Sequence, residues 1–88
     1  MGQVAITYKM NLEGVDTDVD AIQMSAKGLS DEIYDVQAVE IKPLAFGLKY
    51  VQVHVVMDDG EGLVDGFESS LRGIAGVTDL EIIEMGLL

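Results

Sequence analysis

The segment Lys42-Pro43-Leu44-Ala45-Phe46-Gly47-Leu48-Lys49 decides the fold, because it connects two strand-like runs of sequence directly. Pro43, the only proline in the chain, fixes its own φ and disfavours helix at the residue before it, so the first run ends at Lys42. Gly47 permits a backbone geometry that a β-branched residue would resist. Phe46 therefore lies on a connecting loop, where burial is harder than in a strand. A bulky apolar side chain at a loop tip suggests an anchor for a partner.

Strands flank this loop, and helices flank the strands. Residues 33–42 and 48–57 read as strands, and apolar residues alternate most cleanly in the second. Capping residues Asp16, Thr17 and Asp18 and a stop at Gly28 predict the ends of a first helix, and Gly73 or Gly76 ends a second. The outermost segments, 4–12 and 77 to about 85, read as strands again. The helical spacing is carried by Val15, Val19, Ile22, Ala26 and Leu29, and then by Val64, Phe67, Leu71 and Ile74.

The order strand, helix, strand, strand, helix, strand is the split βαβ pattern of an α+β, ferredoxin-like domain. Right-handed crossovers place both helices on one face of a four-stranded antiparallel sheet, which gives a two-layer sandwich. The first and third strands are central in this topology. The second and fourth lie at the edges, and their patterns change phase near Val39 and Ile82. We expect residues 1–88 to form a single domain.

The composition excludes several classes of function. The 88 residues include no cysteine, which removes disulfide frameworks, thiolate zinc sites and cysteine nucleophiles. Sixteen acidic residues against five basic ones give a formal net charge of −11, and this field repels nucleic acid. The acidity suits solubility in a salty cytoplasm and also steering toward a basic partner. The sequence has neither a signal-peptide pattern nor a membrane helix, and we expect a cytoplasmic protein.

Two acidic runs resemble metal-binding loops without completing one. The run 16–20 has the spacing that opens a calcium loop, but Ala21 and Lys27 stand where glycine and glutamate are needed. The turn 58–61 carries three carboxylates, which suit a tight turn and the start of a helix. We therefore expect no metal site and no cofactor.

Catalytic patterns are also missing. His54, the only histidine, falls on the polar face of a central strand with no acid nearby in sequence to orient it as a base. Tyr8 falls on the helix-covered face, where it cannot stack on a nucleic-acid base. Since no GxxxxGK[ST] stretch is present, the chain is not itself a GTPase or ATPase.

The central loop and its surroundings resemble translation elongation factor 1-beta, especially its short archaeal form. The resemblance rests on residues 43–53, on the acidic pair Asp58-Asp59, and on Val77-Thr78-Asp79-Leu80-Glu81 near the end. It covers the entire chain in length and element order. Its most specific part is the Pro-x-x-Phe-Gly segment between the second and third strands.

The resemblance implies a guanine-nucleotide exchange factor for elongation factor 1-alpha, the GTPase that delivers aminoacyl-tRNA to the ribosome. Such a factor makes and breaks no bond, so the implied role is not enzymatic. Pro43, Phe46 and Gly47 are implied to form the loop that engages the GTPase, with Phe46 filling an apolar pocket. Lys42 and Lys49 flank the loop and either meet carboxylates on the GTPase or act as solubilising charges at the strand ends.

One departure from the family concerns the chain end. In eukaryotic members a lysine just before the final residue is thought to reach the partner's magnesium site, whereas Leu87 stands at that place here. A leucine cannot mimic the displaced cation's charge. Either magnesium release follows from movement of the partner's switch segment, or another lysine supplies the charge, or exchange is weaker. We expect this chain end to be mobile.

Two alternatives belong to other classes of function. A ligand-binding or oligomerising regulatory module of the ACT type would use the link Glu13-Gly14-Val15, whose glycine suits such a site. An acylphosphatase-like hydrolase would need an arginine in that link to hold phosphate, but the sole arginine, Arg72, lies at the end of the second helix. The exchange factor therefore ranks first, the ligand module second and the hydrolase third.

Overall fold

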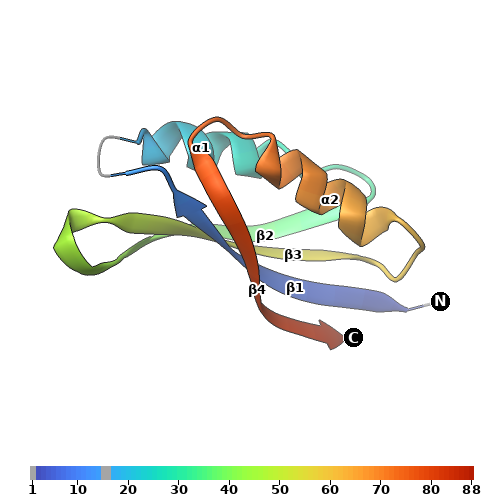
Figure 1. Cartoon of the computed structure of the whole chain (residues 1–88). Coiled ribbons are helices and arrows are strands. Elements are labelled where there is room, and N and C mark those ends of the chain that lie inside the picture. The colour runs from blue at the N-terminus through green and yellow to red at the C-terminus, as the bar shows by residue number, and fades with distance from the viewer. Residues whose placement is uncertain (1, 15–16) are drawn as a thin grey trace.

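The computed structural model describes residues 2–14 and 17–88. Over these residues the chain forms a four-stranded sheet and two helices, and α1 and α2 lie on the same face of the sheet (Figure 1). The predicted α+β, ferredoxin-like fold is confirmed. In chain order the elements are β1 (Gln3–Leu12), α1 (Val19–Lys27), β2 (Tyr34–Pro43), a 3₁₀ turn (Ala45–Gly47), β3 (Lys49–Asp58), α2 (Leu63–Arg72) and β4 (Val77–Leu87).

The strands lie in the order β2-β3-β1-β4, and every neighbouring pair is antiparallel. β1 and β3 are central, as predicted. The phase changes predicted for the edge strands correspond to β-bulges: Gln37 is the extra residue of β2 opposite β3, and Ile83 is the extra residue of β4 opposite β1. Because side chains alternate with a period of two, one extra residue exchanges the faces for the remainder of the strand.

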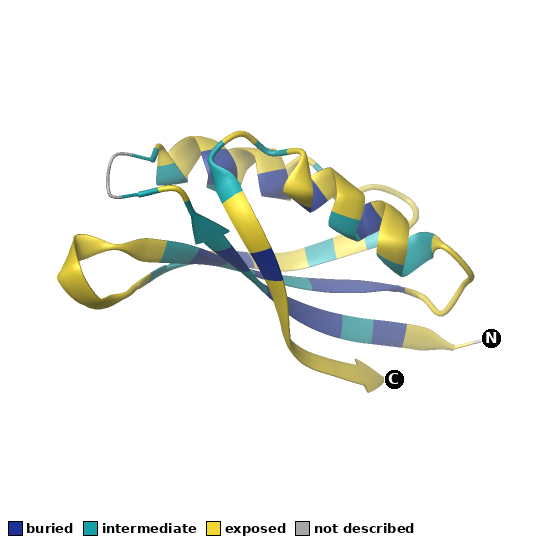
Figure 2. Cartoon of the chain, in the orientation of Figure 1, coloured by how far each residue is buried: buried dark blue, intermediate teal, exposed yellow. Residues whose placement is uncertain are grey.

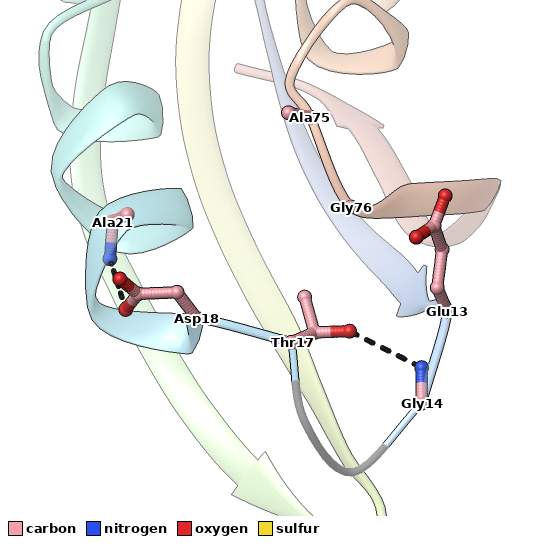
Figure 3. A pocket seen from close by; sticks show the side chains of 7 residues that line it. All are labelled: Glu13, Gly14, Thr17, Asp18, Ala21, Ala75 and Gly76. Carbon is pink, nitrogen blue, oxygen red and sulfur yellow. Dashed lines mark hydrogen bonds between the residues drawn. The ribbon is translucent and has the colours of Figure 1, made fainter.

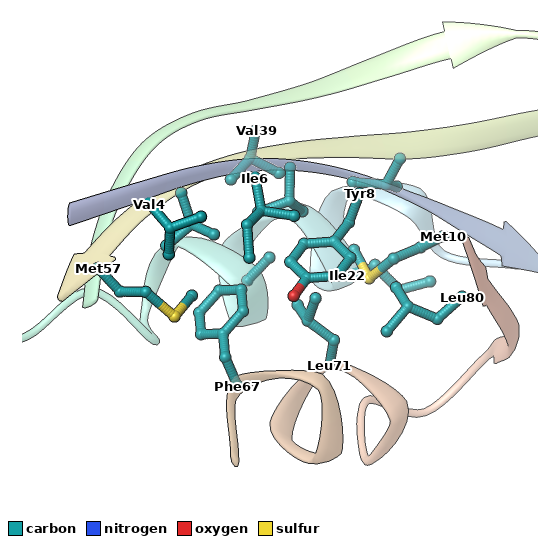
Figure 4. Packing of buried hydrophobic residues seen from close by; sticks show 14 residues of the cluster. Val4, Ile6, Tyr8, Met10, Ile22, Val39, Met57, Phe67, Leu71 and Leu80 are labelled. Carbon is teal, nitrogen blue, oxygen red and sulfur yellow. The ribbon is translucent and has the colours of Figure 1, made fainter. Parts of the chain in front are cut away.

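The core lies between the sheet and the helices (Figure 4). The ring of Tyr8 is fully buried on this face, as its parity predicts, and its centroid lies 5.9 Å from that of Phe67 on α2. Tyr34 packs against the same phenylalanine at 4.9 Å. The other side chains of this core cluster come from all four strands and both helices: Val4, Ile6, Met10, Ile22, Ala26, Val39, Val51, Val53, Val55, Met57, Leu71 and Leu80.

The helix ends follow the predicted capping chemistry. Asp18 is the N-cap of α1, and its carboxylate accepts a hydrogen bond from the backbone N–H of Ala21 at 3.1 Å. Gly28 is the C-cap, as predicted. The predicted helical residue Val15 and the predicted cap Asp16 lie outside the described residues. Of the two predicted stops for α2, Gly73 is the C-cap.

The chain end is held in the sheet, so the expectation of a mobile terminus is wrong. Leu87 pairs with Val4, and the N–H of Leu88 donates to the carbonyl of Gln3 at 2.8 Å. Backbone pairing along an entire strand anchors a terminus that sequence position alone would leave frayed. Within the described part of the chain, α1 and α2 are too short for a transmembrane span.

Candidate functional site

The segment predicted to engage a partner forms the tip of the β2–β3 hairpin. β2 and β3 pair as far as Pro43 and Lys49, one residue beyond the predicted end of the first strand. The N–H of Leu44 donates to the carbonyl of Leu48 at 2.6 Å, and the N–H of Leu48 donates to the carbonyl of Ala45 at 3.2 Å. These bonds close a compact loop around the 3₁₀ turn Ala45–Gly47.

Phe46 is 96% exposed, which confirms the exposure that we predicted from its place in the loop. Its backbone has φ 62° and ψ 30°, in the left-handed region that costs an L-residue roughly 1–2 kcal/mol. Gly47 follows with φ 78°, a conformation that glycine adopts without penalty. Leu44 and Leu48 flank the ring and are themselves partly exposed. The loop thus presents an apolar tip whose aromatic ring lies in water.

The tip stands beyond the rest of the sheet. β3 pairs with β1 only as far as Tyr50 and Asn11, so the hairpin past Tyr50 has no third strand beside it. Figure 1 shows the hairpin extending past the end of the helical layer, and Figure 2 shows its tip exposed throughout. A partner can therefore reach the Phe46 ring without contacting the body of the domain first.

The charges around the tip differ from those of the body. Residues 41–57 contain no acidic residue, although the chain as a whole carries a net charge of −11. Lys42 Nζ lies 2.9 Å from Glu40 Oε2, and this hydrogen-bonded pair raises the pKa of Lys42 and lowers that of Glu40. Lys49 makes no ion pair within residues 2–14 and 17–88. Of the two flanking lysines, Lys42 already has a carboxylate in its own chain.

Sequence reasoning did not find the Lys42–Glu40 pair, although a signal for it is present. Residues two apart in a strand share a face, so oppositely charged residues at 40 and 42 were candidates for a pair. The pair is exposed, and exposed pairs contribute little to stability. It leaves Lys49 as the lysine at the tip with a free ammonium group among the described residues.

The glycine link of the alternative ligand module borders an open pocket of about 680 Å³ (Figure 3). The N–H of Gly14 donates to Thr17 Oγ1 at 3.2 Å, so these two residues lie close together at the pocket. The lining residues that the structure describes include two carboxylates and no basic side chain, so none of these side chains balances the charge of an anionic ligand. The described lining is Glu13, Gly14, Thr17, Asp18, Ala21, Ala75 and Gly76.

The remaining candidate side chains have partners within their own chain. His54 lies half-buried on the face opposite the helices, and its Nδ1 forms a hydrogen bond with Thr7 Oγ1 at 2.9 Å. The sequence did not indicate this partner because it lies on another strand. Arg72 ends α2 and pairs with Glu68 at 3.6 Å, so it is not on the link that a phosphatase would use. No cluster of metal-ligating side chains occurs among the residues that the structure describes.

One exposed apolar surface, on the edge strand β4, was not predicted from the sequence. Ile82, Met85 and Leu87 of β4 pair with Tyr8, Ile6 and Val4, whose side chains are buried under the helices. The β4 residues nevertheless remain about half exposed or more, because they lie on the edge strand beyond Leu80 (Figure 2). Apolar periodicity indicates a face but not whether a helix covers it.

Comparison with known proteins finds similar sequences along the whole chain. The EF-1 guanine nucleotide exchange domain matches residues 5–88. Elongation factor 1-beta of Methanococcoides burtonii is 36% identical over 86 residues, which cover 98% of this chain and 97% of that protein. Elongation factor 1-beta of Methanosphaerula palustris is 36% identical over 87 residues, with 99% of each chain covered. That of Archaeoglobus fulgidus is 33% identical over 88 residues and covers both chains completely.

Proposed function

Because the chain belongs to the family of the EF-1 guanine nucleotide exchange domain, we propose that it promotes GDP release and GTP reloading on elongation factor 1-alpha during translation elongation. The proposed partner is a GTPase, and the place of action is the cytoplasm, where elongation occurs. The observation that carries the proposal is the exposed Phe46 ring at the tip of the protruding hairpin. No bond-breaking chemistry is assigned to the chain itself.

The proposed mechanism is a thermodynamic linkage. An exchange factor binds the nucleotide-free GTPase more tightly than the GDP-bound form, and the same free-energy difference weakens GDP binding by an equal amount. A coupling of about 1.4 kcal/mol weakens GDP tenfold. The contact surface must therefore favour one state of the GTPase, and an apolar ring that fits a pocket in that state supplies such a difference.

We assign the hairpin residues separate parts in this contact. Phe46 enters an apolar pocket of the GTPase, and its exposed ring loses unfavourable contact with water on entry. Pro43 and Gly47 shape the loop, since Pro43 ends β2 and Gly47 accepts φ 78°. Lys49 meets a carboxylate on the GTPase. Lys42 can do the same only by sharing or leaving its bond to Glu40.

The proposed exchange does not use a cation from the chain end. Leu87 is 75% exposed at the end of β4, where relatives in eukaryotes are implied to carry a lysine. We propose that the GTPase loses its magnesium ion indirectly, through displacement of a switch segment when the hairpin binds. This assignment makes GDP release depend on the loop more than on the terminus.

The test uses elongation factor 1-alpha loaded with a fluorescent GDP and chased with excess unlabelled nucleotide. The chain should accelerate loss of the fluorescent GDP in proportion to its concentration until saturation. Phe46→Ala should remove most of the acceleration. Met24→Ala is the matched control, because Met24 is also a large apolar side chain, 74% exposed, but lies on α1 away from the hairpin. Release at the intrinsic rate across a wide range of concentration contradicts the proposal.

A ligand-binding module remains the second candidate, because the open pocket at Gly14 is a concave site of suitable size. Its carboxylate lining restricts the ligand to one bearing a cationic group. Thermal melting with free amino acids tests this reading, since a bound ligand raises the melting temperature. If amino acids raise the melting temperature and elongation factor 1-alpha does not, the ligand-binding module becomes the first candidate and the exchange factor the second.

A further inference from the structure

We propose that Tyr50 is a positioning residue that clamps the root of the β2–β3 hairpin and so holds the Phe46 ring in one orientation toward the partner. The effect on exchange rests on the proposed function. The clamp itself is a property of this chain and can be measured without a partner.

Tyr50 stands where the sheet narrows. It pairs with Asn11 of β1 on one side and with Lys42 of β2 on the other. Past this position only Pro43 and Lys49 still pair, and the loop follows. A two-stranded hairpin in water is marginally ordered by itself, so contacts at its root decide where its tip points.

The two faces of the root are held differently. On the helix side, Val51 is fully buried and belongs to the core. The opposite face has no helix over it (Figure 1). Tyr50 is adjacent to Val51 in β3, so its side chain lies on that opposite face, where it contacts Lys9. If the tyrosine is shortened, the hairpin keeps its core contact on one face and loses its support on the other.

The Tyr50 ring contacts a lysine of the neighbouring strand β1. Lys9 Nζ of β1 lies 4.8 Å from the ring centroid, a cation–π distance. Lys42, directly opposite Tyr50 in the register, is bonded to Glu40. Asn11, opposite on the other side, donates to Glu81 Oε2 of β4 at 3.0 Å. Lys9 is therefore the side chain that holds the Tyr50 ring, and the two register partners of Tyr50 are each tied to a carboxylate of their own.

Such a clamp acts through the population of the binding-competent orientation. If the hairpin occupies that orientation for a fraction of the time, the apparent dissociation constant rises by the inverse of the fraction. The GTPase step that follows binding is unaffected. Loss of the clamp should therefore raise the concentration needed for half-maximal exchange and leave the maximal rate unchanged.

The structural part is tested with a single tryptophan. The chain has no tryptophan, so Phe46→Trp places the only one at the tip, where time-resolved fluorescence anisotropy reports nanosecond loop motion. In this background we expect Tyr50→Leu to lower the residual anisotropy and Tyr50→Phe, which keeps the ring, to preserve it. Lys9→Met should cause a smaller loss. Circular dichroism and melting curves verify that each variant is folded.

Lys9→Met also covers the case in which Tyr50→Leu does not fold, because it removes the cation from a different strand. Unchanged anisotropy in the folded variants that remove the contact overturns the proposal. An equal loss of anisotropy in Tyr50→Phe overturns it too, because the ring is then not the element that acts.

The functional part is tested with Phe46 in place. Tyr50→Leu should raise the half-saturating concentration in the exchange assay by roughly threefold to tenfold, the usual cost of ordering a contact segment, while Tyr50→Phe stays near wild type. A lower maximal rate at unchanged half-saturation contradicts the clamp. If the wild-type chain does not accelerate GDP release at all, the proposed function fails, and the anisotropy still decides whether Tyr50 holds the hairpin.

Discussion

Phe46 and Gly47 adopt left-handed backbone conformations in succession, with φ of 62° and 78°. Only Gly47 adopts this conformation without a steric penalty, because the Cβ atom of an L-residue in this region lies too close to the following carbonyl oxygen. The tip thus places a strained aromatic residue beside an unstrained glycine. Strain of this kind persists where the surrounding hydrogen bonds fix the backbone, and it is often found at functional sites.

Gly47→Ala is expected to weaken the loop, because alanine pays the penalty that glycine avoids. We expect a loss of about 1–2 kcal/mol in the stability of the closed loop, seen as faster amide hydrogen exchange at Leu44 and Leu48. The core should be unaffected. The companion Phe46→Asn keeps a residue that tolerates this conformation but removes the ring. A Phe46→Asn variant with full exchange activity would show that the backbone shape, and not the ring, is recognised.

The buried Tyr8 hydroxyl donates to Glu68 Oε2 at 3.2 Å, and burial followed by the Glu68 charge raises the pKa of this tyrosine well above its ordinary range. The folded state therefore favours the neutral phenol. Its contribution to stability is complete below the unfolded pKa of about 10 and is lost as the pH rises above that value. We expect chemical unfolding to show decreasing stability above pH about 10, with a weaker decrease in Tyr8→Phe. Identical slopes for both proteins contradict this assignment.

Added salt should stabilise the chain. Sixteen acidic residues face five basic ones, and only two ion pairs occur within residues 2–14 and 17–88. Screening relieves the repulsion among the unpaired carboxylates. Each 1 kcal/mol gained corresponds to about 4–8 °C in melting temperature for a domain of this size. Melting in increasing potassium chloride measures the effect. The double variant Asp58→Asn, Asp59→Asn should depend less steeply on salt, and an unchanged slope would argue against charge repulsion as the cause.

Leu87→Lys tests the part played by the chain end. Because Leu87 is largely exposed, we expect the substitution to change stability by no more than about 0.5 kcal/mol. A lysine at this place restores the cation that the family resemblance implies, so the maximal rate of GDP release should rise. Leu87→Gln serves as the polar control without charge. A reduced rate in both variants would mean that the apolar end of β4 itself contacts the GTPase.

Local patterns in the sequence were sufficient to predict the order and type of the strands and helices. Apolar alternation in β1 and β3, helical spacing in α1 and α2, and caps at Asp18, Gly28 and Gly73 all occur where predicted. The hairpin tip was also predictable, because Pro43 and Gly47 restrict the backbone locally. The roles of Lys42, Pro43, Phe46, Gly47 and Lys49 in binding remain predictions for the experiments above.

Contacts between distant segments were not predictable in the same way. Glu68 meets Tyr8, and Thr7 meets His54, across separations that no local pattern spans. The hydrogen bond from the N–H of Leu88 to the carbonyl of Gln3 likewise depends on how far β1 and β4 pair along their length. Strand register and bulges fix these pairs, and one inserted residue such as Ile83 changes them.

The sequence by itself determined the order of strands and helices, the face that each presents to the core, and an aromatic residue at an exposed turn. These features follow from backbone geometry and burial over a few residues. Only the tertiary structure decided that β4 remains uncovered beyond Leu80, that the terminus is tied to β1, and that Tyr50 meets Lys9 below the tip. These depend on which strands become neighbours and in what register, and the chain sets both only when it is folded as a whole.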